Sequence, residues 1–417
     1  MVIAGIVIVV ATFIAIIKQF ETRLVLLLSG LLMCFIGGQL GAGTTAFVKE
    51  LTNPGLVPTI CTVLGFSYVM EYTKCTEHMV YFISAGLKKM TKIIIPGAVI
   101  ITFLINIALP TAAGCAAAVG ALLIPALIRS GVHPAMAGSA IFLGTWGSAL
   151  SPGLMFNPQV AQLAGEDVMT VIASFSMQAI IGIVVAAILL NIVAIVKKEH
   201  TGYVLKAANE EEGKEFKVNY LYAIIPIIPL VLLVLGSKQV AVIPEISVPV
   251  SMLIGTAIGI IAVRPNVTDA VKKFFRGTGD GMCDVVGLMA AAACFTAGMQ
   301  YIGLTSALID GMKNSQQIAQ IGAAFGPFLL AVISGSGNAA ALAFNGAVTP
   351  HAADFGYGIM QLGSMAQLGA GIGRSMSPVA GAGIIIAGLA GINPMEMAKR
   401  NAVPCIIATV VIMLLLL

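Results

Sequence analysis

Two related hexapeptides, one in each half of the chain, decide how this sequence folds. Gly-Ser-Ala-Leu-Ser-Pro occupies residues 147–152, and Gly-Arg-Ser-Met-Ser-Pro occupies residues 373–378. The same offset aligns the surrounding segment, and over residues 147–169 the two halves share 8 of 23 positions. Chance in a chain this rich in glycine and alanine would give about two identities. The chain is therefore predicted to contain two structural repeats.

The composition of the 417 residues places both repeats in a lipid bilayer. Charged residues make up 10% of the chain and apolar residues 59%, and the mean hydropathy is +1.01. An ordinary globular domain carries about 25% charged residues, so a soluble fold of this composition would expose large apolar patches. The formal net charge of +4 is spread in short clusters, which does not suggest a nucleic-acid partner. We predict an all-α polytopic membrane protein.

A charged stretch without apolar periodicity, residues 197–218, separates the two repeats. It mixes lysine and glutamate with polar residues, which is typical of a solvated segment. We predict that it is a linker between a first repeat at 1–196 and a second repeat at 219–417.

Each repeat contains a pair of apolar segments joined by a connection too short to leave and re-enter the bilayer. Proline and threonine separate the first pair, at about 93–128, and Gly-Ser-Gly-Asn separates the second, at about 318–350. We predict that both pairs are re-entrant hairpins with their tips at depth. The hexapeptides interrupt apolar segments at about 135–164 and 355–390, which are predicted to be broken helices at the midplane.

The basic residues predict how the chain is oriented. Each repeat has five predicted spans besides its hairpin, and because five is odd the second repeat must be inverted. With a periplasmic N-terminus, 18 of the 22 Lys and Arg residues fall on the cytoplasmic side and 3 on the outer side, as the positive-inside rule requires. The linker at 197–218 is then cytoplasmic. Asp280 and Asp284 are expected to cap the start of a span at 281–302.

Binding chemistry is expected at the hairpin tips and at the hexapeptides. Proline removes a helical N–H and frees a carbonyl, glycine tolerates the unwound backbone, and serine caps the helix that follows. Helix N-termini exposed at such breaks suit carboxylates, while freed carbonyls and hydroxyls suit a small cation. The predicted substrate-binding residues are Thr111, Ser148, Ser151, Asn157, Ser336, Asn338, Arg374, Ser375 and Ser377.

Arg374 is the basic residue that falls at a predicted break within a span. A charge at the bilayer centre costs about 2.5–3.5 kcal/mol on insertion scales, so it normally faces a cavity or a partner. A guanidinium binds a carboxylate through two parallel hydrogen bonds, which makes an anionic substrate a suitable partner. A structural ion pair is the alternative.

The sequence also predicts what this chain lacks. It contains no Walker loop, no His/Glu metal-ligand set on a helix and no Gly-x-Ser-x-Gly motif. We therefore predict a carrier that is not an enzyme, has no cofactor and is driven by gradients or exchange, with H⁺ or Na⁺ as the coupling ion. Metal ligands are not assigned. The seven cysteines show no Cys-x-x-Cys spacing and are expected to be reduced packing residues.

Several motifs resemble the anaerobic C4-dicarboxylate carrier family, Dcu type C. They are Ser-Gly-Ser-Gly-Asn at 334–338, Asn-Gly-Ala-Val-Thr-Pro-His at 345–351 and the hexapeptide at 373–378. The resemblance extends over essentially the whole chain. The repeat plan is similar to that of the wider ion transporter superfamily, in which Ser-Asn-Thr tips bind carboxylate and sodium. The first tip here reads Pro-Thr-Ala-Ala, so the resemblance does not imply a sodium site in the first repeat.

The resemblance implies a secondary active transporter of the bacterial inner membrane that exchanges or exports succinate, fumarate and malate during anaerobic metabolism. It also implies a homodimer and an elevator-type mechanism, in which the hairpins and broken helices move against the other spans. Other functions use the same architecture. The alternatives are a carrier of another small organic anion or amino acid, and a cation/proton antiporter.

Overall fold

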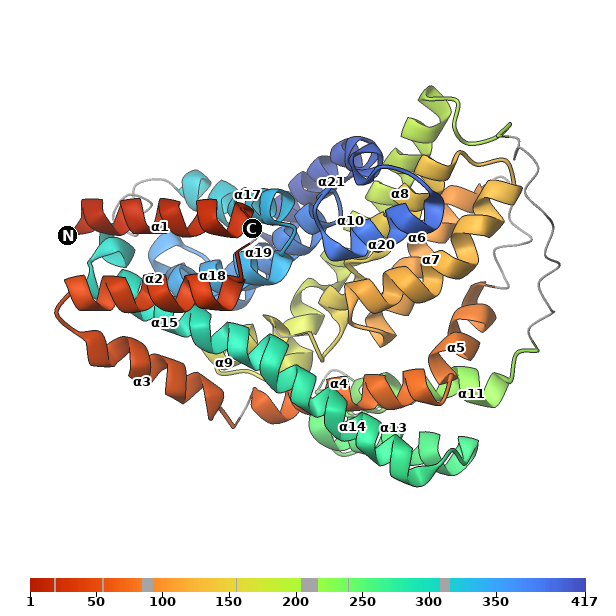
Figure 1. Cartoon of the computed structure of the whole chain (residues 1–417), viewed down its shortest axis with the longest axis horizontal. Helices are drawn as coiled ribbons and strands as arrows, with labels where there is room; N and C mark the ends of the chain where they lie inside the picture. Colours follow the sequence, from red (N-terminus) through yellow and green to blue (C-terminus); the bar gives the residue numbers. More distant parts are fainter. Residues whose placement is uncertain are drawn as a thin grey trace.

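The computed structural model describes residues 1–18, 20–54, 56–84, 93–154, 156–203, 217–238, 240–307 and 316–417. The regular elements in these ranges are helices (Figure 1), which confirms the all-α prediction. Within the described residues, five helical stretches are long and apolar enough to cross a bilayer. They are Ala112–Arg129, Val168–Val196, Val267–Tyr301, Gln317–Ser334 and Pro394–Leu416.

One group of helices, here called the core bundle, is built around the largest buried apolar cluster. Its pairs α6 and α8, α7 and α20, α10 and α21, and α17 and α19 pack against one another. Its members are α6 (Ile94–Ala108), α7 (Ala112–Arg129), α8 (Pro134–Gly144), α9 (Phe156–Ala164), α10 (Val168–Val196), α17 (Gln316–Ser334), α19 (Ile359–Arg374), α20 (Gly381–Ala390) and α21 (Pro394–Leu416).

The other group, here called the flanking bundle, contains a smaller apolar cluster and shares a second one with α9, α17, α18 (Gly337–Ala347) and α19. It pairs helices from the two halves of the chain, such as α2 with α15 and α4 with α14, as Figure 1 shows. Its members are α1 (Val2–Ile17), α2 (Thr22–Ile36), α3 (Leu40–Leu51), α4 (Val57–Tyr72), α5 (Cys75–Ser84), α11 (Tyr220–Ile224), α12 (Ile228–Leu235), α13 (Val248–Val263), α14 (Val267–Asp280) and α15 (Gly287–Tyr301).

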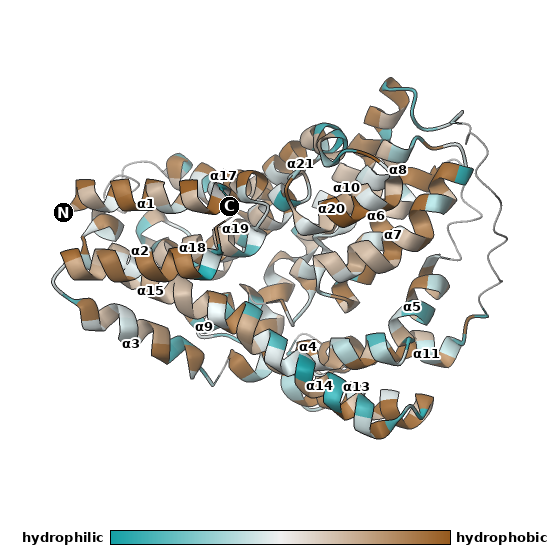
Figure 2. Ribbon diagram, in the orientation of Figure 1, coloured by the Kyte–Doolittle hydropathy of each residue, from teal (hydrophilic) through white to brown (hydrophobic). Residues whose placement is uncertain are grey.

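The outer surfaces of both bundles are apolar, which suits contact with lipid rather than water. Large apolar side chains such as Ile3, Leu28, Ile188 and Ile261 are exposed. Figure 2 shows this as brown ribbon on the peripheral helices, while α14 carries teal, hydrophilic residues. These surfaces agree with a multi-pass membrane protein.

The predicted hairpins and broken helices have clear counterparts. A short turn joins α6 to α7, and another joins α17 to α18. α8 ends at Gly144 and is followed by the 3₁₀ turn η3 (Gly147–Leu150) before α9 begins, while α19 ends at Arg374 and α20 begins at Gly381. That these turns and interruptions form re-entrant hairpins and broken helices of two repeats stays a prediction. Their depth in a membrane and the inverted relation of the repeats stay predictions.

One sequence-based boundary was wrong. The span expected at 281–302 is part of one helix over Val267–Tyr301, in which the π-helical turn η5 (Gly281–Val286) joins α14 to α15. Asp280 and Asp284 are therefore not caps: Asp280 accepts a hydrogen bond from the Tyr68 hydroxyl, and Asp284 pairs with Arg23 at 3.2 Å. The helix continues through these two residues. On the N-terminal side of them, α14 packs its apolar edge against α4.

At the N-terminal side, α2 ends at Ile36, and a turn at Gly37 and Gly38 leads into α3. Gly38 has a φ of +74°, a left-handed conformation that glycine adopts without strain. Of the linker expected at 197–218, positions 204–216 lie outside the described residues.

Candidate functional site

A cavity of about 310 Å³ lies between the core bundle and the flanking bundle. The flanking bundle contributes the apolar side chains of Ile60 and Leu64 from α4 and Val285 from η5. The polar lining comes from the core bundle and α18. The remaining lining residues are Pro110, Thr111, Ala112, Ala113, Gly153, Leu154, Asn338, Arg374, Gly381 and Ala382. The first hairpin tip, both interruptions and the start of α18 thus meet at one place.

Arg374 is the charged residue of this cavity. It is partly buried, its Nη2 donates to the carbonyl of Thr145 at 2.6 Å, and its buried Nε makes no hydrogen bond with the described residues. Among the described residues, no Asp or Glu lines this cavity. A guanidinium held by one carbonyl, with further N–H groups free, is a binding group for an anion.

Helix N-termini add to this positive potential. Ala112 and Ala113 open α7, Asn338 lies in the first turn of α18, and Gly381 and Ala382 open α20. Backbone N–H groups in a first turn have no intrahelical acceptor, and they carry partial positive charge. Thr111, at the N-cap position of α7, does not cap the helix with its hydroxyl. The cavity therefore presents several donors to a carboxylate.

Three of the predicted binding residues, Thr111, Asn338 and Arg374, line this cavity. The other six do not line it: Ser148, Ser151, Asn157, Ser336, Ser375 and Ser377. Ser336 caps α18 by accepting a hydrogen bond from the N–H of Ala339 at 3.4 Å, and Asn338 lies inside that helix. Substrate binding by any of these residues stays a prediction.

The buried serines and Asn157 belong to a polar network behind the breaks. Asn157 donates through its amide to the carbonyls of Ala149 and Ser151, both at 2.8 Å, and accepts from Gln367 at 2.9 Å. These bonds satisfy carbonyls that the interruption frees from helical pairing. Asn157 thus stabilises the first interruption rather than facing the cavity.

Sequence reasoning missed four buried members of this network: Asn106, Thr145, Gln367 and Asn401. Asn401 donates to the carbonyl of Ser375 at 2.9 Å, and the hydroxyls of Thr145 and Ser375 lie 3.4 Å apart. The available signal was an amide inside an otherwise apolar segment, since such a group is costly in lipid unless it is hydrogen-bonded. That signal does not identify its partner.

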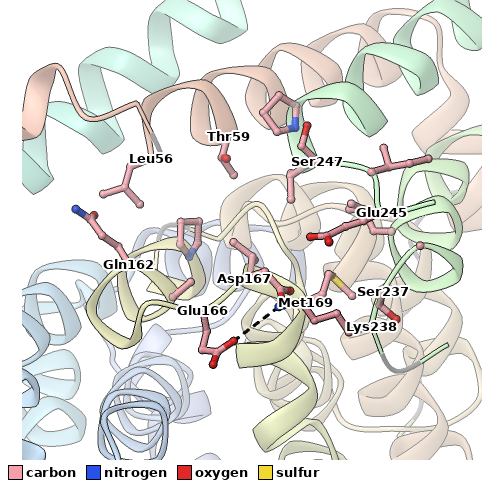
Figure 3. Close-up of a pocket in the computed structure, with 18 residues that line it drawn as sticks. Leu56, Thr59, Gln162, Glu166, Asp167, Met169, Ser237, Lys238, Glu245 and Ser247 are labelled. Carbon is pink, nitrogen blue, oxygen red and sulfur yellow. Dashed lines mark ion pairs between the residues drawn. The ribbon is translucent and has the colours of Figure 1, made fainter. Parts of the chain in front are cut away.

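A second cavity, of about 350 Å³, lies at another part of the boundary between the bundles (Figure 3). Lys238, from the α12–α13 connection, pairs with Asp167 at 2.9 Å and with Glu166 at 3.9 Å. Nearby, Asn53 donates to Gln162 of α9 at 2.9 Å. These contacts, here called the clasp, join the two bundles.

The clasp stays charged over the ordinary pH range. Partial burial of Asp167 opposes its ionisation, but hydrogen bonds from Thr170 and the pairing with Lys238 outweigh that effect and lower its pKa to about 2. Pairing with Asp167 raises the pKa of Lys238. Because the pKa of Asp167 lies below its ordinary value of 3.8, the pairing is complete above pH 4 and is lost as the pH falls toward 2.

A third cavity, of about 310 Å³, lies between α5 and α7 and includes Glu71 and Thr76. The three cavities follow the same two flanking helices in order. Leu56 and Thr59 line the cavity beside the clasp, and Ile60 and Leu64 line the cavity that contains Arg374. Glu71 and Thr76 line the third cavity. Open space therefore follows α4 and α5 along the boundary of the bundles.

Comparison with known proteins identifies the family. A family model described as DcuC, C4-dicarboxylate anaerobic carrier, matches residues 2–417. The chain belongs to the DcuC family. The resemblance inferred from the motifs at the second tip and break is thereby confirmed, and because DcuC proteins are membrane transporters, the chain is a transporter and not an enzyme.

Relatives of this DcuC family member match either nearly all of its length or about two thirds of it. The anaerobic C4-dicarboxylate transporter DcuC of Escherichia coli K12 is 26% identical over 442 residues, which is 98% of this chain and 94% of the relative. An uncharacterized transporter of Haemophilus influenzae is 38% identical over 278 residues, which is 64% of this chain and 100% of the relative.

The fold of this DcuC family member is similar to that of a solved transporter. The crystal structure of the Alcanivorax borkumensis YdaH transporter, which has an unusual topology, matches with a TM-score of 0.58. It covers 89% of this chain and 87% of that chain at 14% identity, a level that shows the fold alone.

Proposed function

We propose that this chain transports C4-dicarboxylates such as succinate, fumarate and malate across the bacterial inner membrane, by exchange or efflux. The observation that carries the proposal is the Arg374 guanidinium, which has free N–H groups in a cavity where helix N-termini converge. The names of the full-length relatives support the substrate class. A cation/proton antiporter is less well supported because none of the described residues that line this cavity is a carboxylate.

In this proposal the two carboxylates of the substrate bind different parts of the site. One accepts hydrogen bonds from Arg374, and the other lies against Thr111, Asn338 and the N-termini of α7 and α18. Ser336 and the buried serines hold the backbone that presents these groups. A dianion balances the positive potential of the cavity better than a monoanion, which favours dicarboxylates over lactate or gluconate.

We further propose an elevator-type mechanism. The core bundle and α18 supply the polar groups, whereas the flanking bundle supplies an apolar wall. A binding site carried mostly by one bundle travels with that bundle, and the cavities along α4 and α5 mark the track. The flanking bundle then forms the static part and the homodimer contact. The N-terminus is periplasmic and the linker is cytoplasmic in this proposal, and H⁺ or Na⁺ is the coupling ion.

A proteoliposome assay tests the substrate. Vesicles loaded with unlabelled succinate are diluted into labelled fumarate, with pH and sodium varied independently, and lactate, gluconate and glutamate serve as competitors. We expect saturable counterflow that C4-dicarboxylates inhibit and the monoanions do not. Absence of succinate–fumarate exchange under every gradient would refute the proposal, and inhibition by a monoanion alone would favour the other anion carriers.

A further inference from the structure

One buried amide lies between the first hairpin tip and the first helix interruption. Asn106 is in the last turn of α6 and is 0% exposed. Its Nδ2 donates to the carbonyl of Leu109 at 2.9 Å, and its Oδ1 accepts from the backbone N–H of Ser148 at 2.7 Å. The two backbone groups are the ones that the adjoining breaks leave without helical partners. A single side chain therefore satisfies both.

The bond to Ser148 has a consequence for Arg374. In a 3₁₀ turn the N–H of Ser148 would pair with the carbonyl three residues earlier, which is Thr145. That carbonyl instead accepts from Nη2 of Arg374 at 2.6 Å. Asn106 takes over the N–H of Ser148, so the carbonyl of Thr145 is left to hold the guanidinium.

The bond to Leu109 acts on the other polar part of the cavity. Leu109 ends α6 in a non-helical conformation and directly precedes Pro110 and Thr111. Proline has no N–H, so the backbone at this tip has few hydrogen bonds of its own. Fixing the carbonyl of Leu109 therefore fixes the direction in which the chain enters the tip. Thr111 lies two residues further on, in the lining of the Arg374 cavity.

Close packing brings the interruption within reach of Asn106. A Cβ on Gly147 would lie 2.1 Å from the carbonyl oxygen of Phe103, and one on Gly144 would lie 2.7 Å from that of Val99. Both distances are too short for any side chain, so these glycines let the backbone at the break lie directly on α6. Asn106 is the next residue along the same helix that meets the break.

We propose that Asn106 is a positioning residue that sets the relative placement of Thr111 and Arg374 across the substrate cavity. It lines none of the cavity itself and acts through Leu109, Ser148 and Thr145. This inference rests on the proposed substrate site for its functional consequence. Its structural content, that one amide couples the tip to the break, does not depend on the identity of the substrate.

The test uses Asn106→Leu, which keeps the branched shape of the side chain, adds some volume and removes both hydrogen bonds. The matched control is Ser251→Ala: Ser251 is equally buried and donates to the carbonyl of Pro229 at 2.8 Å, but it lies within the flanking bundle. Hydrogen–deuterium exchange is measured on the purified full-length protein, and succinate binding is measured by calorimetry. Thermal unfolding reports whether each variant is folded.

For Asn106→Leu we expect exchange at least tenfold faster in the segments 109–115 and 147–153, with the other core helices unchanged. Succinate binding is expected to weaken at least tenfold, while Ser251→Ala binds as the wild type does. A uniform rise in exchange over the whole core bundle, or unchanged exchange at either segment, would overturn the inference. If wild-type protein fails to bind succinate, the substrate proposal fails, and the exchange data still decide the role of Asn106.

Discussion

Replacement of Arg374 tests the substrate site most directly. Its Nη2 donates to Thr145 and its Nε makes no hydrogen bond with the described residues, so in the proposed complex Nε and Nη1 are the groups assigned to the substrate. A hydrogen bond to a charged group contributes about 1.5–3 kcal/mol, so the loss of two such bonds in Arg374→Met costs about 3–6 kcal/mol of binding. At about 1.4 kcal/mol per factor of ten, dicarboxylate affinity is expected to fall roughly a hundredfold to ten-thousandfold.

The same substitution has a smaller effect on folding. It leaves the carbonyl of Thr145 without its partner, which costs about 1–3 kcal/mol, but it also removes a partly buried charge that has no ion pair, which offsets part of that cost. We therefore expect Arg374→Met to reach the membrane and to unfold near the wild-type temperature. Arg374→Lys keeps the charge without the planar fork and is expected to have an intermediate affinity.

Succinate counterflow in proteoliposomes and calorimetric binding to the purified carrier give KM and Kd for the three proteins. The amount of folded carrier is normalised by size-exclusion chromatography, so that a loss of protein is not mistaken for a loss of binding. If Arg374→Met transports succinate with a KM within threefold of the wild-type value, the guanidinium does not bind the substrate. The assignment of this cavity as the substrate site would then be wrong.

Three further predictions concern the clasp, the second hairpin tip and the orientation of the chain. Lys238→Glu places a fourth acidic side chain beside Glu166, Asp167 and Glu245, so the clasp should open and an impermeant thiol reagent should label Ala161→Cys faster. The charge exchange Asp167→Lys/Lys238→Asp should restore slow labelling. Unchanged labelling in both variants would show that the clasp does not hold the bundles together. Because Asp167 has a pKa of about 2, the labelling rate of Ala161→Cys with the native clasp, divided by that of a free thiol at the same pH, should not change between pH 5 and 8. Gly335 has a φ of +74°, and a Cβ there would lie 2.9 Å from the backbone of Val379. Gly335→Ala should therefore lower the free energy of unfolding, measured by denaturant titration, by about 1–2 kcal/mol or more. The control Gly326→Ala should not lower it, because a Cβ at that position meets nothing within 4 Å. Thr201→Cys should react with an impermeant reagent only in inside-out vesicles, and labelling in intact cells would reverse the proposed orientation.

Much of the candidate site could be predicted because its signals are local. Proline, glycine and serine at 147–152 and 373–378 predict interruptions wherever they occur in apolar segments, since they remove or compete for helical hydrogen bonds. Arg374 was identifiable because a lone charge in an apolar segment is costly. The structure places it with Thr111 and Asn338 at one cavity, as the convergence of breaks and tips suggested.

Other features had no local signal. Asp280 and Asp284 look like helix caps in sequence. In the structure the helix continues past both, and each binds a side chain more than 200 residues away, Tyr68 or Arg23. Ser148, Ser151 and Asn157 were expected at the substrate, but their polar groups are buried in the network behind the breaks. The clasp joins α9 and the α9–α10 connection to the α3–α4 and α12–α13 connections, and the sequences of these segments give no sign of their proximity.

The sequence by itself determined that this chain is an all-helical membrane carrier of the DcuC family, with helix pairs and interruptions at defined positions. Hydrophobicity and helix-breaking residues act along the chain and can be read without knowledge of contacts. Only the tertiary structure decided which partner satisfies each backbone group that a break sets free, and hence which polar side chains face the cavity. That outcome depends on helices such as α6, α8 and α19 meeting in space, and one-dimensional periodicity carries no information about which helices meet.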